Sequence, residues 1–473
     1  MTILATDIKF RKSALVSDSI NNGGRKGYPE VVSGARHSLF PRVTKTERTA
    51  GVIRYRKEFL SNEDSGNETA YGVEVCLEIP STGGDNFQLC SGSQTNIQSD
   101  LSLSTRPSFY GTGQLQADIT DASTSIPITM ESNTIEFPNG KNLHISDKYA
   151  ISQTIDTDVN IGDSVELISG TWEKSNSSDD ITYPLGLYLG NNIVMTVQDS
   201  TNEEWLELAD NLTTAEVIGT GNDTANPNLT TLANKTNGIC KQTDKRPTVV
   251  AISGGNPLLV TIDRDGLCSG DCTAGQLNMT TGVWTTKIVW TDEIDNATNI
   301  TCTYRENCFS YSGNVATVEL SGNPANSYDK DNTFAGGCIS MGDVKTSFDA
   351  WDETSSAGTF DESNMPLILS NKGTVEDTFT ITFATATTFA CSGAAEGSLG
   401  TGAIGADFSP ININTGFPYF TIDKDGWGGT WAIGETIVFK THPSAMGIWL
   451  KETVPALTAA VANNLCVLGF YAE

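Results

Sequence analysis

Histidine and basic side chains are scarce in this sequence. Its 473 residues include 3 His and 29 Lys and Arg against 57 Asp and Glu, which gives a net charge of −28 at pH 7. Because an acidic body repels nucleic acid and anionic membranes, we expect neither as a partner. No window approaches the roughly 20 apolar residues of a membrane helix, and the N-terminus has no apolar signal-peptide core. We therefore expect no membrane insertion and synthesis in a cytoplasm.

Motifs of known catalytic sites are also missing. The three histidines, His37, His144 and His442, stand in no H-E-x-x-H or similar ligand pattern, and the sequence has no G-x-S-x-G and no phosphate-binding loop. We therefore predict no enzymatic activity, no metal and no cofactor. A carboxylate pair for glycoside cleavage stays open, because acidic residues occur throughout the chain. The strand-like setting of the tryptophans favours the core over a sugar-binding surface for Trp284, Trp290, Trp427 and Trp431.

Long runs of helix-forming residues are rare, whereas Thr, Asn and 45 Gly are frequent. Many short segments alternate apolar and polar residues with the period of a half-buried strand. In DTFTITF (377–383), for example, Phe379, Ile381 and Phe383 face one side and the threonines face the other. The sequence predicts an all-β fold of several β-sandwich or jelly-roll-like modules, with an extended N-terminal arm and few short helices.

Composition suggests three consecutive domains. They are a basic arm and β platform over 1–120, a β domain with one short helix and a polar linker over 121–237, and a cysteine-containing β domain or domains over 238–473. The helix is expected over TNEEWLELADNL (201–212), since Thr201 or Asn202 can cap it, and the linker over 213–237. The strands 52–59 and 73–79 are expected to pair, with Arg54 and Arg56 facing Glu74 and Glu78.

Two loops share the sequence T-I-D-basic-D-G, at 261–266 and 421–426. Neither provides the further ligands of an EF-hand calcium loop. An acidic turn between two strands is the interpretation that we favour for both.

Ten cysteines are present, six of them between 240 and 338. The pattern C-x3-C followed by C-x5-C matches structural zinc sites poorly, and no histidine lies nearby. Disulfides or buried thiols are the favoured interpretations. The disulfide candidates nearest to one another in sequence are Cys268, Cys272, Cys302 and Cys308.

A basic segment near the N-terminus stands out from the acidic chain. Residues 1–60 carry twelve basic and five acidic side chains, a net charge of +7, whereas the rest of the chain carries −35. We interpret this segment as an anchor that docks on an acidic neighbour, although pairing within the chain is an alternative. Its predicted contact residues are the cations Arg42, Lys45, Arg48, Arg54, Arg56 and Lys57 and the aromatic residues Phe40, Tyr55 and Phe59.

The same segment carries a family resemblance. NGGR (22–25), LFPRV (39–43), ER (47–48) and RYRK (54–57) resemble the opening of a group of virion structural proteins of tailed bacteriophages, and IWLKETVP (448–455) resembles its closing segment. The resemblance implies a neck or collar component, located in a virion assembled in the host cytoplasm. Its implied partners are head–tail connector or tail proteins and further copies of this chain. A baseplate or tail module that binds a host receptor or surface glycan is the alternative, and a carbohydrate-active enzyme the third.

Two expectations follow for such a particle protein. Because virions leave the reducing cytoplasm, several cysteines of the 240–338 cluster are expected to pair as disulfides. A chain without residues 1–60 is expected to stay folded and to be absent from particles.

Overall fold

The computed structural model describes residues 3–32, 37–81, 83–101, 107–147, 202–211, 214–233, 237–331, 333–460 and 466–472, and between 148 and 201 only the backbone of five strands. The predicted all-β class is confirmed. The described part has one α-helix, α1 (Lys45–Ala50), and the 3-10 turns η1 (Ala5–Asp7), η2 (Gln98–Asp100), η3 (Thr243–Lys245) and η4 (Lys424–Gly426). No helix in these described ranges is long and apolar enough to cross a membrane.

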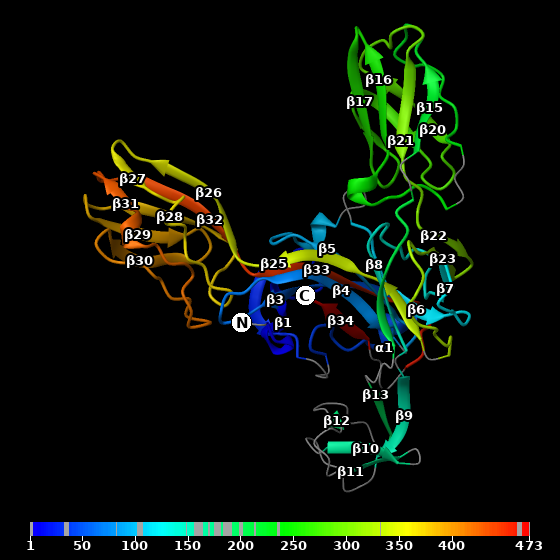
Figure 1. The fold of residues 1–473 in the computed structure, drawn as a ribbon, viewed down its shortest axis with the longest axis horizontal. Helices are drawn as coiled ribbons and strands as arrows, with labels where there is room; N and C mark the ends of the chain where they lie inside the picture. The colour runs from blue at the N-terminus through cyan, green and yellow to red at the C-terminus, as the bar shows by residue number, and fades with distance from the viewer. Residues whose placement is uncertain are drawn as a thin grey trace.

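The centre of the molecule is a two-sheet unit that we call the platform (Figure 1). One sheet has the order β2 (Gly23–Glu30), β1 (Ile8–Leu15), β3 (Val52–Asn62), β33 (Ala445–Val454), β5 (Asn86–Gly92). The other has the order β25 (Ile339–Val344), β4 (Ala70–Ile79), β34 (Val467–Tyr471). Buried residues of both sheets, among them Leu60, Val75 and Ile448, form one core. The platform therefore joins the two ends of the chain.

The platform corrects two expectations from sequence. The expected N-terminal arm contains a hairpin, because β1 pairs with β2 on one side and β3 on the other. Register shifts interrupt the β1–β2 ladder, which hides the period of two in the sequence. The segments 52–59 and 73–79 do form strands but do not pair together. β3 pairs with β33, and β4 pairs with β25 and β34.

A second unit, which we call the lobe, is built on a seven-stranded sheet. Its order is β14 (Glu203–Glu207), β8 (Asn142–Ser146), β24 (Phe334–Gly337), β6 (Thr112–Leu115), β7 (Ser125–Thr129), β23 (Val315–Glu319), β22 (Phe309–Ser312). The helix predicted over 201–212 is wrong, because residues 203–207 form the edge strand β14, paired with β8. A separate sheet is inserted between β8 and β14, with the order β12 (Ile181–Thr182), β10 (Ser164–Ile168), β11 (Thr171–Lys174), β9 (Tyr149–Ile155), β13 (Asn192–Val197).

Two sandwich-like modules project from these units (Figure 1). The first module comprises β15 (Thr214–Thr220), β21 (Asn299–Tyr304), β16 (Thr248–Ser253), β17 (Asn256–Ile262) and β18 (Cys268–Gly270), with β19 (Cys272–Leu277) and β20 (Trp284–Trp290). The second comprises β26 (Ser347–Thr354), β32 (Thr436–His442), β28 (Asp377–Phe383), β29 (Thr388–Gly393) and β30 (Gly397–Ala403), with β27 (Gly358–Phe360) and β31 (Trp427–Gly429). Each module has its own buried core.

The two modules confirm the predicted strand face of β28 and the two predicted acidic turns, but the predicted order of three consecutive domains is wrong. Phe379, Ile381 and Phe383 are buried on one face of β28, as their alternation predicts. The two T-I-D loops are acidic turns, in which Asp263 and Asp423 each accept a hydrogen bond from the backbone N–H two residues later. The units are nested rather than consecutive, however, and the segment predicted as a linker over 213–237 contains β15.

Each module leaves and rejoins the chain at one place. Thr214 is paired with Tyr304 across β15 and β21, and Ser347 with His442 across β26 and β32. Polar contacts fix the first module to the lobe: Lys245 Nζ lies 3.0 Å from the Asp210 carboxylate, and Arg264 lies 2.5 Å from Glu136. Each module is therefore an insertion with adjacent ends.

This nesting predicts opposite outcomes for two deletions. Replacement of residues 348–441 by a short Gly/Ser linker should leave the platform folded, since paired residues lie only about 5 Å apart. Deletion of residues 1–60, which the sequence alone suggested would leave the chain folded, should instead unfold the platform, because it removes β1, β2 and most of β3. Circular dichroism and thermal melting of both variants check this. A folded chain without residues 1–60 would contradict the role that we give to β3.

Candidate functional site

The basic segment lies on β3, and its cations are directed into the platform. Arg54 is 4% exposed and lies 2.5 Å from the carboxylate of Glu452, which faces it from β33. Burial raises the pKa of Glu452 to about 7, and the Arg54 guanidinium offsets part of that rise. The partner of Arg54 is therefore a residue of the same chain, almost four hundred positions away.

The next two cations are also satisfied internally. Arg56 Nη2 lies 2.6 Å from Asp18, and its Nη1 donates to the carbonyl of Ser17. Lys57 is fully buried and donates to the carbonyls of Gly24 (2.6 Å) and Asn96 (3.0 Å). Burial lowers the pKa of Lys57 to about 7. These side chains tie the β1–β2 connection to β3.

The predicted contact residues therefore fall into three groups, which are buried, half-buried and exposed. Arg54, Arg56, Lys57 and Phe59 are buried, so the docking role predicted for them is wrong: a partner cannot reach side chains that the platform encloses. Phe40 and Tyr55 are half-buried, with Phe40 packed on Phe87 and Tyr55 near Phe109. Arg48 is half-buried, and only Arg42 and Lys45 are exposed.

The disulfide candidates do not form disulfides. All ten cysteines, each within the described part, are free thiols. Cys302 and Cys308 belong to different cores, that of the first module and that of the lobe, so their closeness in sequence does not bring them together. Burial raises the pKa of Cys268 and Cys302 to about 12, which keeps both protonated.

A polar seam joins β4 of the platform to β8 of the lobe. Glu74, Cys76 and Glu78 alternate along β4 and so share one of its faces. Asn142 on β8 donates to Glu74 at 2.9 Å, and the Cys76 thiol bonds the His144 ring. The glutamates predicted to face arginines of β3 therefore face the lobe instead.

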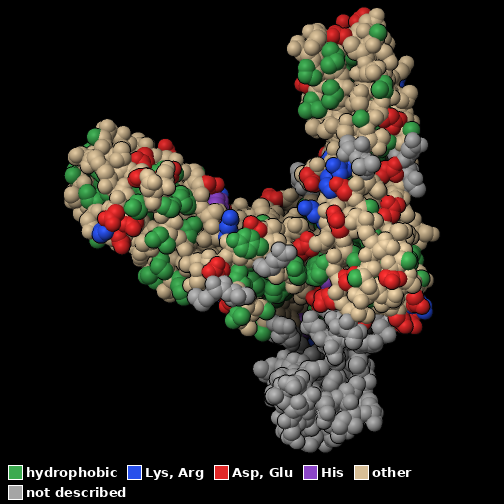
Figure 2. Space-filling model, in the orientation of Figure 1, with side chains coloured by type: hydrophobic (Ala, Val, Ile, Leu, Met, Phe, Trp, Pro, Cys, Tyr) green, Lys and Arg blue, Asp and Glu red, His purple; other side chains and the backbone are tan. Residues whose placement is uncertain are grey.

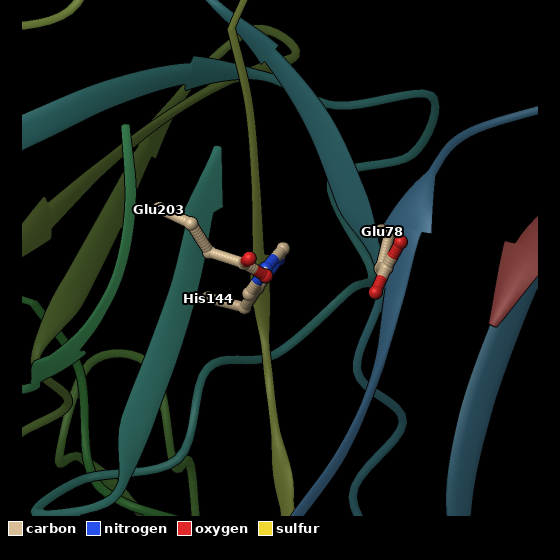
Figure 3. A group of neighbouring side chains, drawn as sticks. All are labelled: Glu78, His144 and Glu203. Atoms are coloured by element: carbon tan, nitrogen blue, oxygen red, sulfur yellow. The ribbon is translucent and has the colours of Figure 1, made fainter. Parts of the chain in front are cut away.

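His144 is the centre of this seam. Its side chain is 1% exposed, and its Nε2 lies 2.6 Å from Oε1 of Glu203 on β14. Glu78 approaches from β4 (Figure 3), and the donor atoms of Glu78, His144 and Glu203 all lie within 4.8 Å of one another. The Trp205 ring packs beside the imidazole, 4.8 Å between centroids.

The ionisable side chains of the seam change one another's pKa values. Desolvation acts to lower the pKa of His144, but Cys76, Glu203 and Glu78 together raise it. The pKa of Cys76 is lowered in turn, because its contacts with Cys338 and His144 outweigh its burial. The site thus favours positive charge at His144. The sequence analysis did not predict this site around His144. Its only local signal was that Glu74, Cys76 and Glu78 share one face of β4.

Glu58, a buried carboxyl group next to Lys57, allows a test of how a buried charge affects the stability of the platform. Glu58 is 1% exposed, its Oε1 has no hydrogen-bond partner, and burial raises its pKa to about 8. A carboxyl whose pKa rises on folding destabilises the folded state as pH increases from 4.5 to 8. Glu58→Gln should therefore stabilise the protein by about 2–4 kcal/mol at pH 9 and change little at pH 4. Chemical denaturation at both pH values measures this difference.

Glu63 provides the matched control for Glu58. Desolvation acts to raise its pKa, but Arg11, which bonds both of its carboxylate oxygens, lowers it overall. Such a group stabilises the fold above pH 4.5, and this contribution is lost as pH falls. Glu63→Gln should therefore destabilise the protein at pH 9. Equal effects of the two substitutions would contradict this assignment.

Comparisons of the chain with protein-family models, with curated proteins and with solved structures find no match.

Proposed function

We propose that this protein is a non-enzymatic structural component of a tailed-phage virion, most simply of the neck or collar, with the platform as its base. One observation supports this. The two parts of the chain that carry the resemblance, within 22–57 and 448–455, meet in space, since β3 and β33 pair over ten residues from Val52–Val454 to Ser61–Ala445. The resemblance thus covers one structural unit, whereas the modules are insertions into it.

The exposed contact residues of this base lie at one end of the β3–β33 pair. Arg42 lies shortly before α1, and Lys45 is the first residue of that helix. Gly51, which follows the last residue of α1, lies against Ala456. Ile53 is 55% exposed, and Leu457 is 84% exposed with a positive φ of 66°. A bulky residue held in that conformation is strained, which is typical of functional surfaces.

These residues define the docking patch, formed by Arg42, Lys45, Ile53 and Leu457. Exposed ion pairs contribute only about 0–1 kcal/mol each, so the two apolar side chains provide most of the binding and the two cations orient an acidic neighbour. The surface visible in Figure 2 carries many acidic side chains, and their mutual repulsion keeps copies apart outside the particle.

Neither of the alternative functions, a receptor- or glycan-binding tail module and a carbohydrate-active enzyme, is favoured by a specific observation in the described residues. A glycan-binding tail module needs exposed aromatic rings. Of the tryptophans considered for such a surface, Trp427 packs on Phe360 (4.9 Å between centroids) and Trp431 (5.7 Å) in the second module. Trp290 and Trp431 are 2% exposed. These rings serve as core, as the alternation of the sequence predicts.

The docking patch predicts a defect in particle assembly. A triple variant Arg42→Glu, Lys45→Glu, Leu457→Asp should fold normally and enter particles about thirtyfold less, since loss of one interface hot spot costs about 2 kcal/mol. Quantitative mass spectrometry of purified particles measures occupancy, and immunogold electron microscopy locates the protein at neck or tail.

Two other exposed lysines control for charge alone. Lys330 in the lobe and Lys424 in the second module each pair only with the adjacent aspartate. Lys330→Glu, Lys424→Glu should enter particles at the wild-type level. If the docking-patch variant does the same, the base docks through another surface, and if the wild-type protein is absent from particles, the virion role is wrong.

A further inference from the structure

We propose that Glu78, His144 and Glu203 form a binding site for a divalent transition-metal ion of the zinc class, which links the platform to the lobe. The site is independent of the virion role. Its three donors come from three strands, β4, β8 and β14, and are separated by 66 and 59 positions in sequence. It is the one group of this kind in the described ranges of the chain.

The donor set matches the chemistry of zinc. Imidazole nitrogen and carboxylate oxygen bind Zn²⁺ at about 2.0–2.2 Å, which places donors of a tetrahedral site about 3–3.5 Å apart. Here all three donors already lie within 4.8 Å of one another. Each glutamate side chain has three rotatable bonds, and rotation about them changes the spacing of the donors. Ca²⁺ and Mg²⁺ prefer oxygen donors alone, so the imidazole disfavours both.

The electrostatics of the seam also favour a cation. Glu78 is 7% exposed, and its carboxylate and that of Glu203 lie beside the same imidazole, so two acidic donors and one neutral donor are brought together. Glu203 is 38% exposed, which gives an ion a path from solvent and leaves a position for water.

The surroundings hold the donors in place. The Cys76 thiol bonds the His144 ring, and the Trp205 ring packs beside it at a tilt of 56°. The Trp205 ring lies in turn 5.4 Å from the ring of Tyr471 at the end of β34. Outer contacts of this kind orient a histidine ligand. An ion at this position would bind the edge strand of the lobe to the central strand of the smaller platform sheet.

His442 also lies between two carboxylates, but their arrangement does not suit a metal ion. His442 bonds Glu376 through Nδ1 (2.7 Å) and Asp349 through Nε2 (3.2 Å). The two carboxylates therefore lie on opposite sides of the ring and cannot share one ion with a single nitrogen. His442 thus serves as a control for adventitious zinc binding to a surface histidine.

The test uses the full-length protein and Zn²⁺ alone. After dialysis against EDTA, the protein is loaded with ZnCl2 and passed over a sizing column, and its zinc content and affinity are measured by mass spectrometry and calorimetry. We expect one zinc per chain and a higher melting temperature with Zn²⁺ but not with Ca²⁺. Glu203→Gln, at a partly exposed position that tolerates an amide, should weaken binding at least tenfold, whereas His442→Gln should leave it unchanged.

Other results would overturn the site. If the protein retains no zinc, the proposed metal site is wrong. If His442→Gln removes binding and Glu203→Gln does not, the zinc is adventitious. X-ray absorption of the wild-type zinc complex gives a test without variants: a first shell of nitrogen and oxygen supports the site, and a sulfur-dominated shell, from Cys76 and Cys338, contradicts this donor set.

Discussion

The pairing of β3 with β33 is the constraint on which the rest of the structure depends. It joins strands almost four hundred residues apart and closes the central sheet between the β1–β2 hairpin and β5. Such a contact costs loop-closure entropy that is recovered only when the whole sheet forms. Every other unit must therefore leave the platform and return to it, which explains why the modules begin and end at paired residues.

The buried charges on β3 act on the register of this pairing. A slip of one residue would turn Arg54 to the opposite face and separate it from Glu452, and an unpaired buried charge costs about 3–5 kcal/mol. The same slip would displace Lys57 from the carbonyls of Gly24 and Asn96. The basic residues near the N-terminus, which in sequence suggest an external partner, thus align two distant parts of one chain.

Features of the structure that depend on residues close in the chain could be predicted from the sequence, whereas features that depend on contacts between distant residues could not. Strands with clean alternation, such as β28, were predictable because one face of each is buried on its own module. The strand β14 was not, since its Glu203 and Glu204 favour a helix locally but bond His144 on one side and Tyr328 on the other. The His144 site was unpredictable for the same reason: its donors have no common motif, and only the packing of β4 on β8 brings them together.

Contacts between units differ in kind from contacts within them. Each core is apolar and belongs to one unit, whereas the boundaries carry polar contacts, such as Glu74 with Asn142 between platform and lobe and Lys245 with Asp210 between lobe and first module. Polar boundaries cost little when a unit folds alone, because water replaces the lost partner. They also respond to ions, since salt screens exposed pairs and a cation strengthens a carboxylate-rich seam. The geometry between units is therefore set by electrostatics, while the stability of each unit is set by its own core.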